Sequence, residues 1–175
     1  LMLVREDSQI AGSVSGGCVE GVVIDAALEI IKTSGSQRLD FGVADATAWE
    51  VGLSCGGKIS VLLMAVSETG FAPALLVDAA KFLAQRLPVG FCLPVNGGPA
   101  RQAASLQAIS ALVDDEFWFM QAPRPQIIII GAVHISQHLA SMATQSGFEV
   151  TVVDPRRTFA TAERFPGIKL VFDWP

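Results

Sequence analysis

Apolar and polar residues alternate in two short runs at the start of the chain, residues 1–5 and residues 10–14, with a polar stretch between them. A period of two is the pattern of a half-buried strand, so the two runs predict a hairpin. From Val19 to Ile31 the period changes, because apolar residues recur every three or four positions and Gly35 follows them. This spacing predicts an amphipathic helix that begins directly after the hairpin.

The middle of the chain contains segments with helical spacing of apolar residues and segments typical of strands. Apolar residues at helical spacing between residues 73 and 86 predict a second helix, because the proline at its start is tolerated in a first turn. The order of elements is that of a mixed α/β domain rather than of a strict repeat. Strands are predicted near residues 37–43, 58–66, 88–95 and 108–113.

A linker and a second domain are predicted after this region. Two prolines separated by one residue in segment 121–125 indicate an extended connection, since neither a helix nor a central strand would contain them. We therefore expect one domain over residues 1–120 and a second over residues 126–175. In the second, a strand over residues 126–130, a helix, and a strand over residues 149–153 predict a Rossmann-like parallel sheet.

The fold class that follows is α/β, with a mixed α/β N-terminal domain and a Rossmann-like parallel-sheet domain after it. The first residues already read as a strand, so we expect the chain to begin inside a domain.

The turn of the Rossmann-like domain departs from the dinucleotide-binding pattern. Gly131 follows the first strand and Asp154 ends the second, about 20 residues later, as that pattern requires. However, the branched Val133 stands where the backbone must approach a pyrophosphate, so NAD(P) binding is not expected. Asp154 has two interpretations: an acceptor for a ribose hydroxyl, or a cap of the turn at Pro155.

Two further side chains of this domain are candidates. His134 is placed by the pattern at a helix N-terminus near the cleft, where it would be a ligand or an acid/base group; the alternative is a capping or packing histidine. Arg156 is a candidate phosphate-binding residue, or else a solvated surface arginine. The candidate cofactor-binding residues of this domain are Gly131, His134 and Asp154.

Composition and charge exclude several classes of protein. The 175 residues are 51% hydrophobic and 17% charged, which is enough to build a substantial core. A formal net charge of −5 without a Lys/Arg cluster argues against a nucleic-acid partner. No apolar run approaches the roughly 20 residues of a membrane helix, and the N-terminus does not resemble a signal peptide. Three cysteines without a Cys-x-x-Cys pair indicate neither a disulfide framework nor a zinc ribbon, so a cytoplasmic protein is expected.

Two of the cysteines lie in mirrored glycine-rich motifs, Ser-Gly-Gly-Cys-Val-Glu over residues 15–20 and Ser-Cys-Gly-Gly over residues 54–57. In the first motif, small residues let backbone N–H groups point into one concavity and the following helix adds its positive end, which suits an anion. A helix N-terminus also favours a thiolate, so Cys18 is a candidate nucleophile or soft-metal ligand; the alternative is a tight turn around a buried thiol. The candidate cofactor-binding residues here are Ser15, Gly16, Gly17, Cys18, Cys55, Gly56 and Gly57.

Three other residues receive plainer interpretations. Glu20 is the one carboxylate next to the first motif, but acids are common in the first turn of a helix, so no catalytic role is assigned to it. Lys58 follows the second motif and either places a cation there or lies exposed at a strand start. Cys92 lies in an apolar run and is expected in the core.

Taken together, these residues resemble the xanthine dehydrogenase accessory proteins of the XdhC and CoxI family. The resemblance rests on residues 12–20, residues 52–59, and residues 147–156 with the Phe-Ala-Thr and Arg-Phe-Pro motifs that follow. The family usually carries Gly-Ala-Gly-His at the Rossmann turn, so Val133 departs from this pattern as well. The Rossmann domain of family members continues further, whereas this chain reaches only a third strand of it. The resemblance therefore implies a chain that is truncated at both ends, with an incomplete sheet and an exposed sheet edge.

The resemblance implies an accessory protein rather than an enzyme. Such a protein binds molybdenum cofactor transiently, holds it while a cysteine desulfurase supplies a sulfido ligand, and delivers it to the apo-subunit of a molybdenum hydroxylase. We expect the loops of Cys18 and Cys55 to converge on one cleft, where either thiol is a possible molybdenum contact, and we expect a homodimer. The alternatives are an NAD(P)-dependent Rossmann oxidoreductase, or a thiol-based sulfur carrier in which Cys18 takes a persulfide and Cys55 resolves it.

Overall fold

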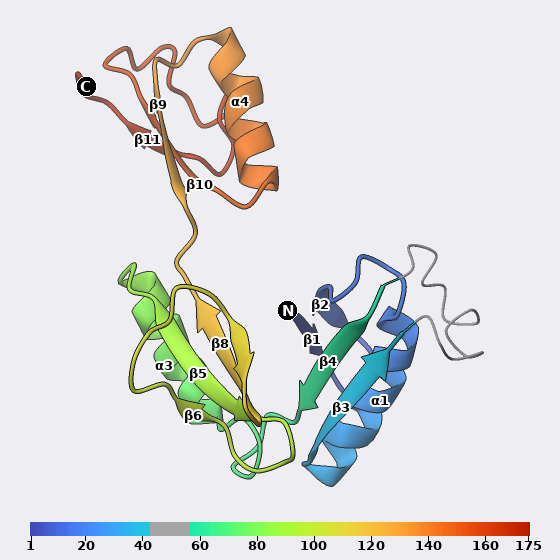
Figure 1. The fold of residues 1–175 in the computed structure, drawn as a ribbon. Helices are drawn as coiled ribbons and strands as arrows, with labels where there is room; N and C mark the ends of the chain where they lie inside the picture. Colours follow the sequence, from blue (N-terminus) through green and yellow to red (C-terminus); the bar gives the residue numbers. More distant parts are fainter. Residues whose placement is uncertain (43–56) are drawn as a thin grey trace. The chain divides into compact units, whose positions relative to one another are not determined.

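The chain forms two compact units, Leu1–Ala122 and Pro123–Pro175, which are described separately below. The structure is a computed structural model and describes residues 1–42 and 57–175 (Figure 1). The predicted fold class is confirmed, because the first unit mixes helices with antiparallel strands and the second contains a parallel sheet.

The first half of unit 1 is built around one helix. The N-terminal hairpin and a second antiparallel hairpin both contact helix α1 (Glu20–Thr33). Apolar side chains from the helix and from the second hairpin form one core cluster, including Val19, Val23 and Val61. The predicted hairpin, helix and strand pair are therefore confirmed. The strands are β1 (Met2–Val4), β2 (Ile10–Gly12), β3 (Ser36–Phe41) and β4 (Ile59–Met64).

The second half of unit 1 is a four-stranded antiparallel sheet with helix α3 (Pro73–Ala84) packed on β5 (Val89–Pro94). Its order is β6-β5-β8-β7, with β6 at Arg101–Gln102, β7 at Ala111–Val113 and β8 at Glu116–Gln121. Strands β6 and β8 were not expected from the sequence, so the prediction for this part of the domain was incomplete. Strand β8 pairs with β5 along six residues, which places it in the middle of the sheet.

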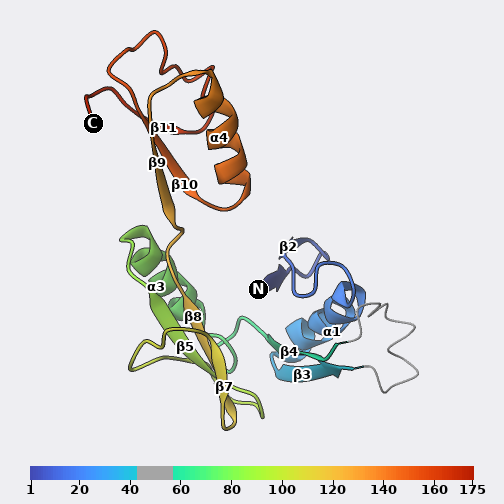
Figure 2. The ribbon, with the colours of Figure 1, turned by 45° about the horizontal axis from the view of Figure 1, so that its top comes forward.

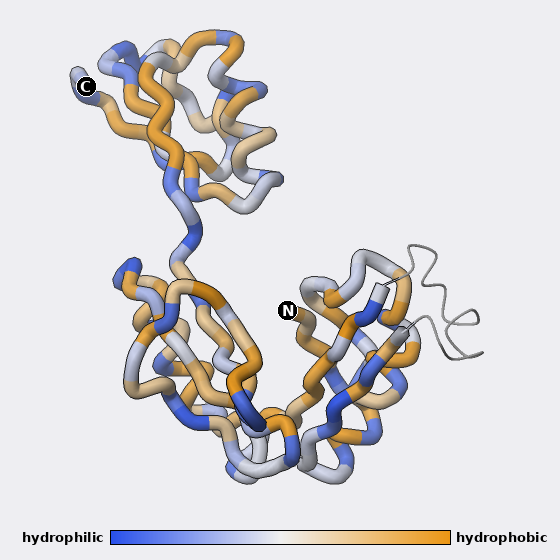
Figure 3. Tube along the Cα trace, viewed as in Figure 1, coloured by the Kyte–Doolittle hydropathy of each residue, from blue (hydrophilic) through white to orange (hydrophobic). Residues whose placement is uncertain are grey.

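Unit 2 is a three-stranded parallel sheet with one helix (Figure 1, Figure 2). Its apolar strands stand out in the hydropathy colouring (Figure 3). Helix α4 covers one face, and residues from the helix, the strands and the following loop, including Ala140, Val152 and Phe165, form the core. The order is β11-β10-β9, with β9 at Gln126–Ile130, α4 at His134–Gln145, β10 at Glu149–Val153 and β11 at Lys169–Val171.

The strands of unit 2 expose one face as well as burying the other. Ile129 is buried in the core, whereas Ile128 and Ile130 on the same strand are each 66% exposed. This alternation follows from the pleat, which points successive side chains to opposite faces. None of the helices in the described parts of the chain is long and apolar enough to cross a membrane.

Candidate functional site

The loop that carries Cys18 joins strand β2 to helix α1 and is anchored by the core on both sides. Val19, directly before the helix, is fully buried, and Val14 packs against the same core cluster. Cys18 is half-buried and also packs against this cluster. Gly16 and Gly17 have φ angles of +81° and +117°, a backbone conformation that only glycine adopts readily, so these two residues allow the loop to fold back on itself.

The concavity of this loop holds an anion that belongs to the chain itself, the carboxylate of Glu20. Five backbone N–H groups donate to its two oxygens at 2.8 to 3.2 Å. Two hydroxyl groups donate as well, from Ser13 at 2.6 Å and from Ser15 at 2.5 Å. The five backbone donors are those of Val14, Ser15, Gly16, Gly17 and Val19.

The two serine hydroxyls extend this network to the rest of the loop. The Ser15 hydroxyl accepts hydrogen bonds from the backbone N–H of Cys18 at 2.9 Å and of Val19 at 3.0 Å, while it donates to Glu20. The Ser13 hydroxyl accepts from the N–H of Gly16 at 2.9 Å. Ser15 therefore links the carboxylate to the backbone of the cysteine, and Ser13 links it to the glycine turn.

The electrostatics of the site follow from this arrangement. Hydrogen bonds from the Ser13 and Ser15 hydroxyls, and then from the backbone of the loop, hold the pKa of Glu20 well below its usual range. The carboxylate is charged at any physiological pH and neutralises the positive end of α1. This role of Glu20 was not predicted, although Glu20 follows a run of small residues whose backbone supplies several N–H donors.

The predicted anion site of Ser15, Gly16 and Gly17 is already occupied by a carboxylate of the chain. The N–H groups that were expected to face an outside anion donate to Glu20 instead. An outside anion would have to displace this carboxylate to reach them. Cys18 has no hydrogen bond from its thiol to Glu20, so the thiol is the group of this loop that stays open to a ligand among the described contacts.

The second cysteine motif is described only at its end. Cys55 and Gly56 lie outside the described residues, so the predicted convergence with Cys18 concerns a part of the chain that the structure does not describe. Gly57 is described and exposed. The residues that flank the segment, Phe41 of β3 and Ile59 of β4, pair with each other and pack against the cluster that also includes Cys18.

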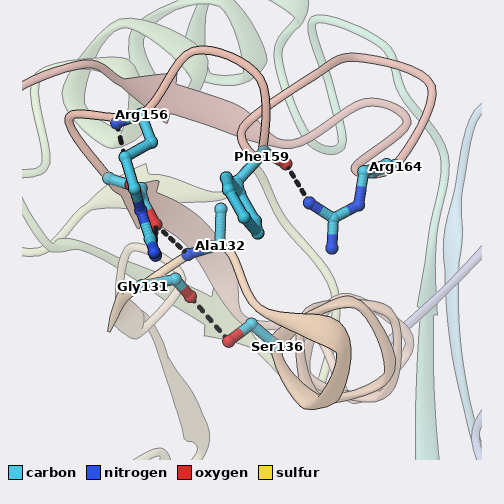
Figure 4. A network of polar contacts seen from close by, with 7 residues as sticks. Gly131, Ala132, Ser136, Arg156, Phe159 and Arg164 are labelled. Carbon is cyan, nitrogen blue, oxygen red and sulfur yellow. Dashed lines mark hydrogen bonds and ion pairs between the residues drawn. The ribbon is translucent and has the colours of Figure 1, made fainter.

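The candidate residues of unit 2 form a second network, at the carboxyl ends of β9 and β10. Asp154 is 1% exposed, and one of its oxygens accepts the backbone N–H of Ala132 at 2.7 Å (Figure 4). Arg156 donates to both oxygens, through its backbone N–H at 2.8 Å and its guanidinium at 2.8 and 2.9 Å. The Arg156 side chain, followed by the Ala132 and Arg156 backbone, holds the pKa of Asp154 well below its usual range.

These contacts favour one of the two interpretations of Asp154. It caps the turn at Pro155 through the N–H of Arg156 and also holds the first turn through Ala132. Gly131, at φ +98°, lies in that first turn, and its carbonyl accepts the Ser136 hydroxyl at 2.7 Å. Asp154 therefore joins the two turns, and its oxygens are occupied by the protein.

Positive charge and histidine also gather on unit 2. The guanidinium of Arg156 lies 4.3 Å from the centre of the Phe159 ring, and Arg164 donates to the Phe159 carbonyl at 2.5 Å. His134 is exposed at the start of α4, and its ring lies 4.9 Å from that of His138 in an edge-to-face arrangement. Among residues 1–42 and 57–175 no group of three or more His, Cys, Asp or Glu side chains is placed to hold a metal ion.

Comparison with known proteins finds a family model that matches the segment carrying each network. Residues 1–42 match the XdhC and CoxI family, and residues 127–170 match the XdhC Rossmann domain. The Glu20 network lies within the first match, and Gly131, His134 and Asp154 lie within the second.

Two curated relatives come from Escherichia coli strain K12. The molybdenum cofactor insertion chaperone PaoD is 30% identical over 173 residues, which covers 93% of this chain and 49% of that protein. The uncharacterized protein YqeB is 25% identical over 165 residues, which covers 94% of this chain and 20% of that protein. The chain therefore spans half or less of the length of these relatives.

A solved structure supports the fold. The crystal structure of a xanthine dehydrogenase from Bacillus halodurans superimposes with a TM-score of 0.80 at 22% identity, and the match covers 98% of this chain and 58% of that one. The predicted family resemblance is confirmed by the two family matches and by the curated relative. The comparisons therefore relate residues 1–42 of the chain to the XdhC and CoxI family, and residues 127–170 of its second unit to the XdhC Rossmann domain.

Proposed function

We propose that this chain is part of an accessory protein that binds molybdenum cofactor and delivers it to the apo-subunit of a molybdenum hydroxylase of the xanthine dehydrogenase type. The relationship to a molybdenum cofactor insertion chaperone supports the cofactor-handling role. In this proposal the binding is transient and cytoplasmic, a cysteine desulfurase supplies the sulfido ligand during it, and the protein acts as a homodimer. No catalytic residue is assigned.

The observation that carries the proposal is the position of Cys18. Its half-buried thiol lies at the start of α1, in the part of the chain that matches the XdhC and CoxI family. A cysteine sulfur is a soft ligand and suits the metal end of the cofactor. The phosphate end suits the loop less well, because the backbone donors of the loop are bonded to Glu20.

The hairpin of β3 and β4 supports a shared site for Cys18 and Cys55. Helix α1 runs away from the Cys18 loop, and β3 begins three residues after its end and is antiparallel to β4. Phe41 and Ile59, at the open end of that hairpin, pack against the same cluster as Cys18. The chain therefore enters and leaves the segment that carries Cys55 at the end of the unit that bears Cys18.

The test is an anaerobic binding measurement with isolated molybdenum cofactor, in the wild type and in Cys18→Ser and Cys55→Ser variants. Cys92→Ala is the matched control, because Cys92 is fully buried on β5 and should not reach a ligand. We expect either motif variant to weaken binding at least about tenfold, equal to about 1.4 kcal/mol, while the control binds as the wild type does. Wild-type affinity in both motif variants would contradict the proposed site.

A control ligand separates the alternatives. NAD binding in the absence of cofactor binding would favour the oxidoreductase. A persulfide on Cys18, formed without any affinity for the cofactor, would favour the sulfur carrier.

A further inference from the structure

The Cys18 loop contains two glycines, yet hydrogen bonds to a single side chain, that of Glu20, hold its backbone in place. Glu20 accepts from five backbone N–H groups and two hydroxyls, which are distributed over every residue of the loop from Ser13 to Gly17 and over Val19. Between Val14 and Val19, Cys18 is the one residue whose N–H does not donate to the carboxylate directly. It is held through Ser15.

We propose that Glu20 is a positioning residue: it fills the glycine turn as an internal anion and fixes the backbone of Cys18 through the hydroxyl of Ser15. The functional half of this inference rests on the proposed role of Cys18 in cofactor binding. The structural half does not, because it concerns the geometry and accessibility of a thiol that can be measured without any cofactor.

The direction of the hydrogen bonds supports a relay rather than a set of independent contacts. The Ser15 hydroxyl has one proton, which it gives to Glu20, and its lone pairs then face the N–H groups of Cys18 and Val19. A charged acceptor strengthens the bond and fixes the orientation of the hydroxyl. The network therefore ties the thiol-bearing residue to the buried Val19, and removal of the carboxylate would free both.

The Glu20 carboxylate also determines whether this loop binds the phosphate of a ligand or a group that the Cys18 thiol can contact. Because five N–H groups already donate to Glu20, an outside phosphate gains no contact here unless it expels a charged group that the loop satisfies fully. The loop therefore recognises its ligand through the Cys18 thiol, and a phosphate must be bound by other residues.

Two serine variants test this role by direct comparison. Ser15→Ala removes the relay to Cys18, whereas Ser13→Ala removes an equally close hydroxyl contact to Glu20 that leads to Gly16 instead. Glu20→Ala removes the internal anion itself, and the atoms lost correspond to acetate, so added acetate can refill the turn.

The measurement is the rate of Cys18 alkylation by iodoacetamide, followed by peptide mass spectrometry, with Cys92 as an internal reporter of global unfolding. Because Cys18 is half-buried in the ordered loop, we expect Glu20→Ala and Ser15→Ala to raise its rate about three- to tenfold while Ser13→Ala changes it less than twofold. In Glu20→Ala, 50 to 100 mM acetate should return the rate toward that of the wild type, whereas chloride at equal ionic strength should not.

The outcomes distinguish this inference from the proposed function. Equal rates in Ser15→Ala and Ser13→Ala, or no response of Glu20→Ala to acetate, would overturn the positioning role even if the wild type binds cofactor. The expected rates in a wild type that does not bind cofactor would retain the positioning role and reject the proposed function. If Cys92 becomes reactive in Glu20→Ala, the comparison of the two serine variants decides, since each keeps the carboxylate.

Discussion

Truncation of Phe165 should unfold unit 2 while unit 1 stays folded. Phe165 is 1% exposed in the core of unit 2, and it follows Arg164, which contacts the Phe159 carbonyl near the Asp154 network. Replacing a buried phenylalanine by alanine costs about 3–5 kcal/mol. A unit of about 50 residues has a total stability of only about 3–8 kcal/mol. Phe165→Ala should therefore remove most or all of the stability of this unit.

Hydrogen exchange by mass spectrometry tests this segment by segment. In Phe165→Ala we expect the amides of β9 and β10 to exchange at least about a hundredfold faster, whereas the amides of β3 and β4 keep wild-type protection. Phe172→Ala is the matched control, because Phe172 is 40% exposed and its loss should cost about 1 kcal/mol or less. Equal loss of protection in both units would refute their independence, and unchanged protection of β9 would refute the assigned core.

Three further outcomes are expected. The pKa of Glu20 is depressed in the folded state, so the unfolded chain binds more protons below about pH 4.5 and stability falls there; chemical unfolding between pH 7 and 3 should show a shallower fall in Glu20→Gln than in the wild type. The pKa of Asp154 is lowered mainly by Arg156, so Arg156→Leu should flatten the acid loss of stability of unit 2 in the same assay; a parallel curve would contradict this. In the native protein, iodoacetamide should label Cys18 well before Cys92, since Cys92 is fully buried and burial raises its pKa; equal labelling rates would argue against the packing of β5.

The regular elements with a clear period could be predicted from the sequence. Helix α1 has apolar residues at strict helical spacing, and the strand, helix and strand of unit 2 follow the order of a parallel crossover. Strand β8 was missed because its aromatic residues form a continuous run rather than an alternation, and because all six of its residues are half-buried. Its place in the sheet is determined by pairing with β5, which is distant in the sequence.

The sequence predicted where the two candidate sites lie along the chain, but not which hydrogen bonds their side chains make. The glycine motif correctly indicated a concavity lined with N–H donors, because glycine permits the positive φ angles at Gly16 and Gly17. What fills the concavity depended on the direction of one side chain, that of Glu20, which the spacing of residues does not reveal. The same holds for Asp154, whose contacts with Ala132 and Arg156 could not be read from the spacing of residues.

The two units share a physical design that bears on the proposed role. Each contains a glycine turn that a carboxylate of the chain holds: in unit 1 Glu20 accepts five backbone N–H groups of the loop, and in unit 2 Asp154 accepts the N–H of Ala132. A turn whose donors are already satisfied gains little from an outside anion, because every new hydrogen bond replaces an existing one. A turn of this kind is ordered before a ligand binds, but its backbone N–H groups contribute little to the affinity for that ligand. A protein that must release its cargo to another needs both properties, since tight phosphate binding by either turn would oppose delivery.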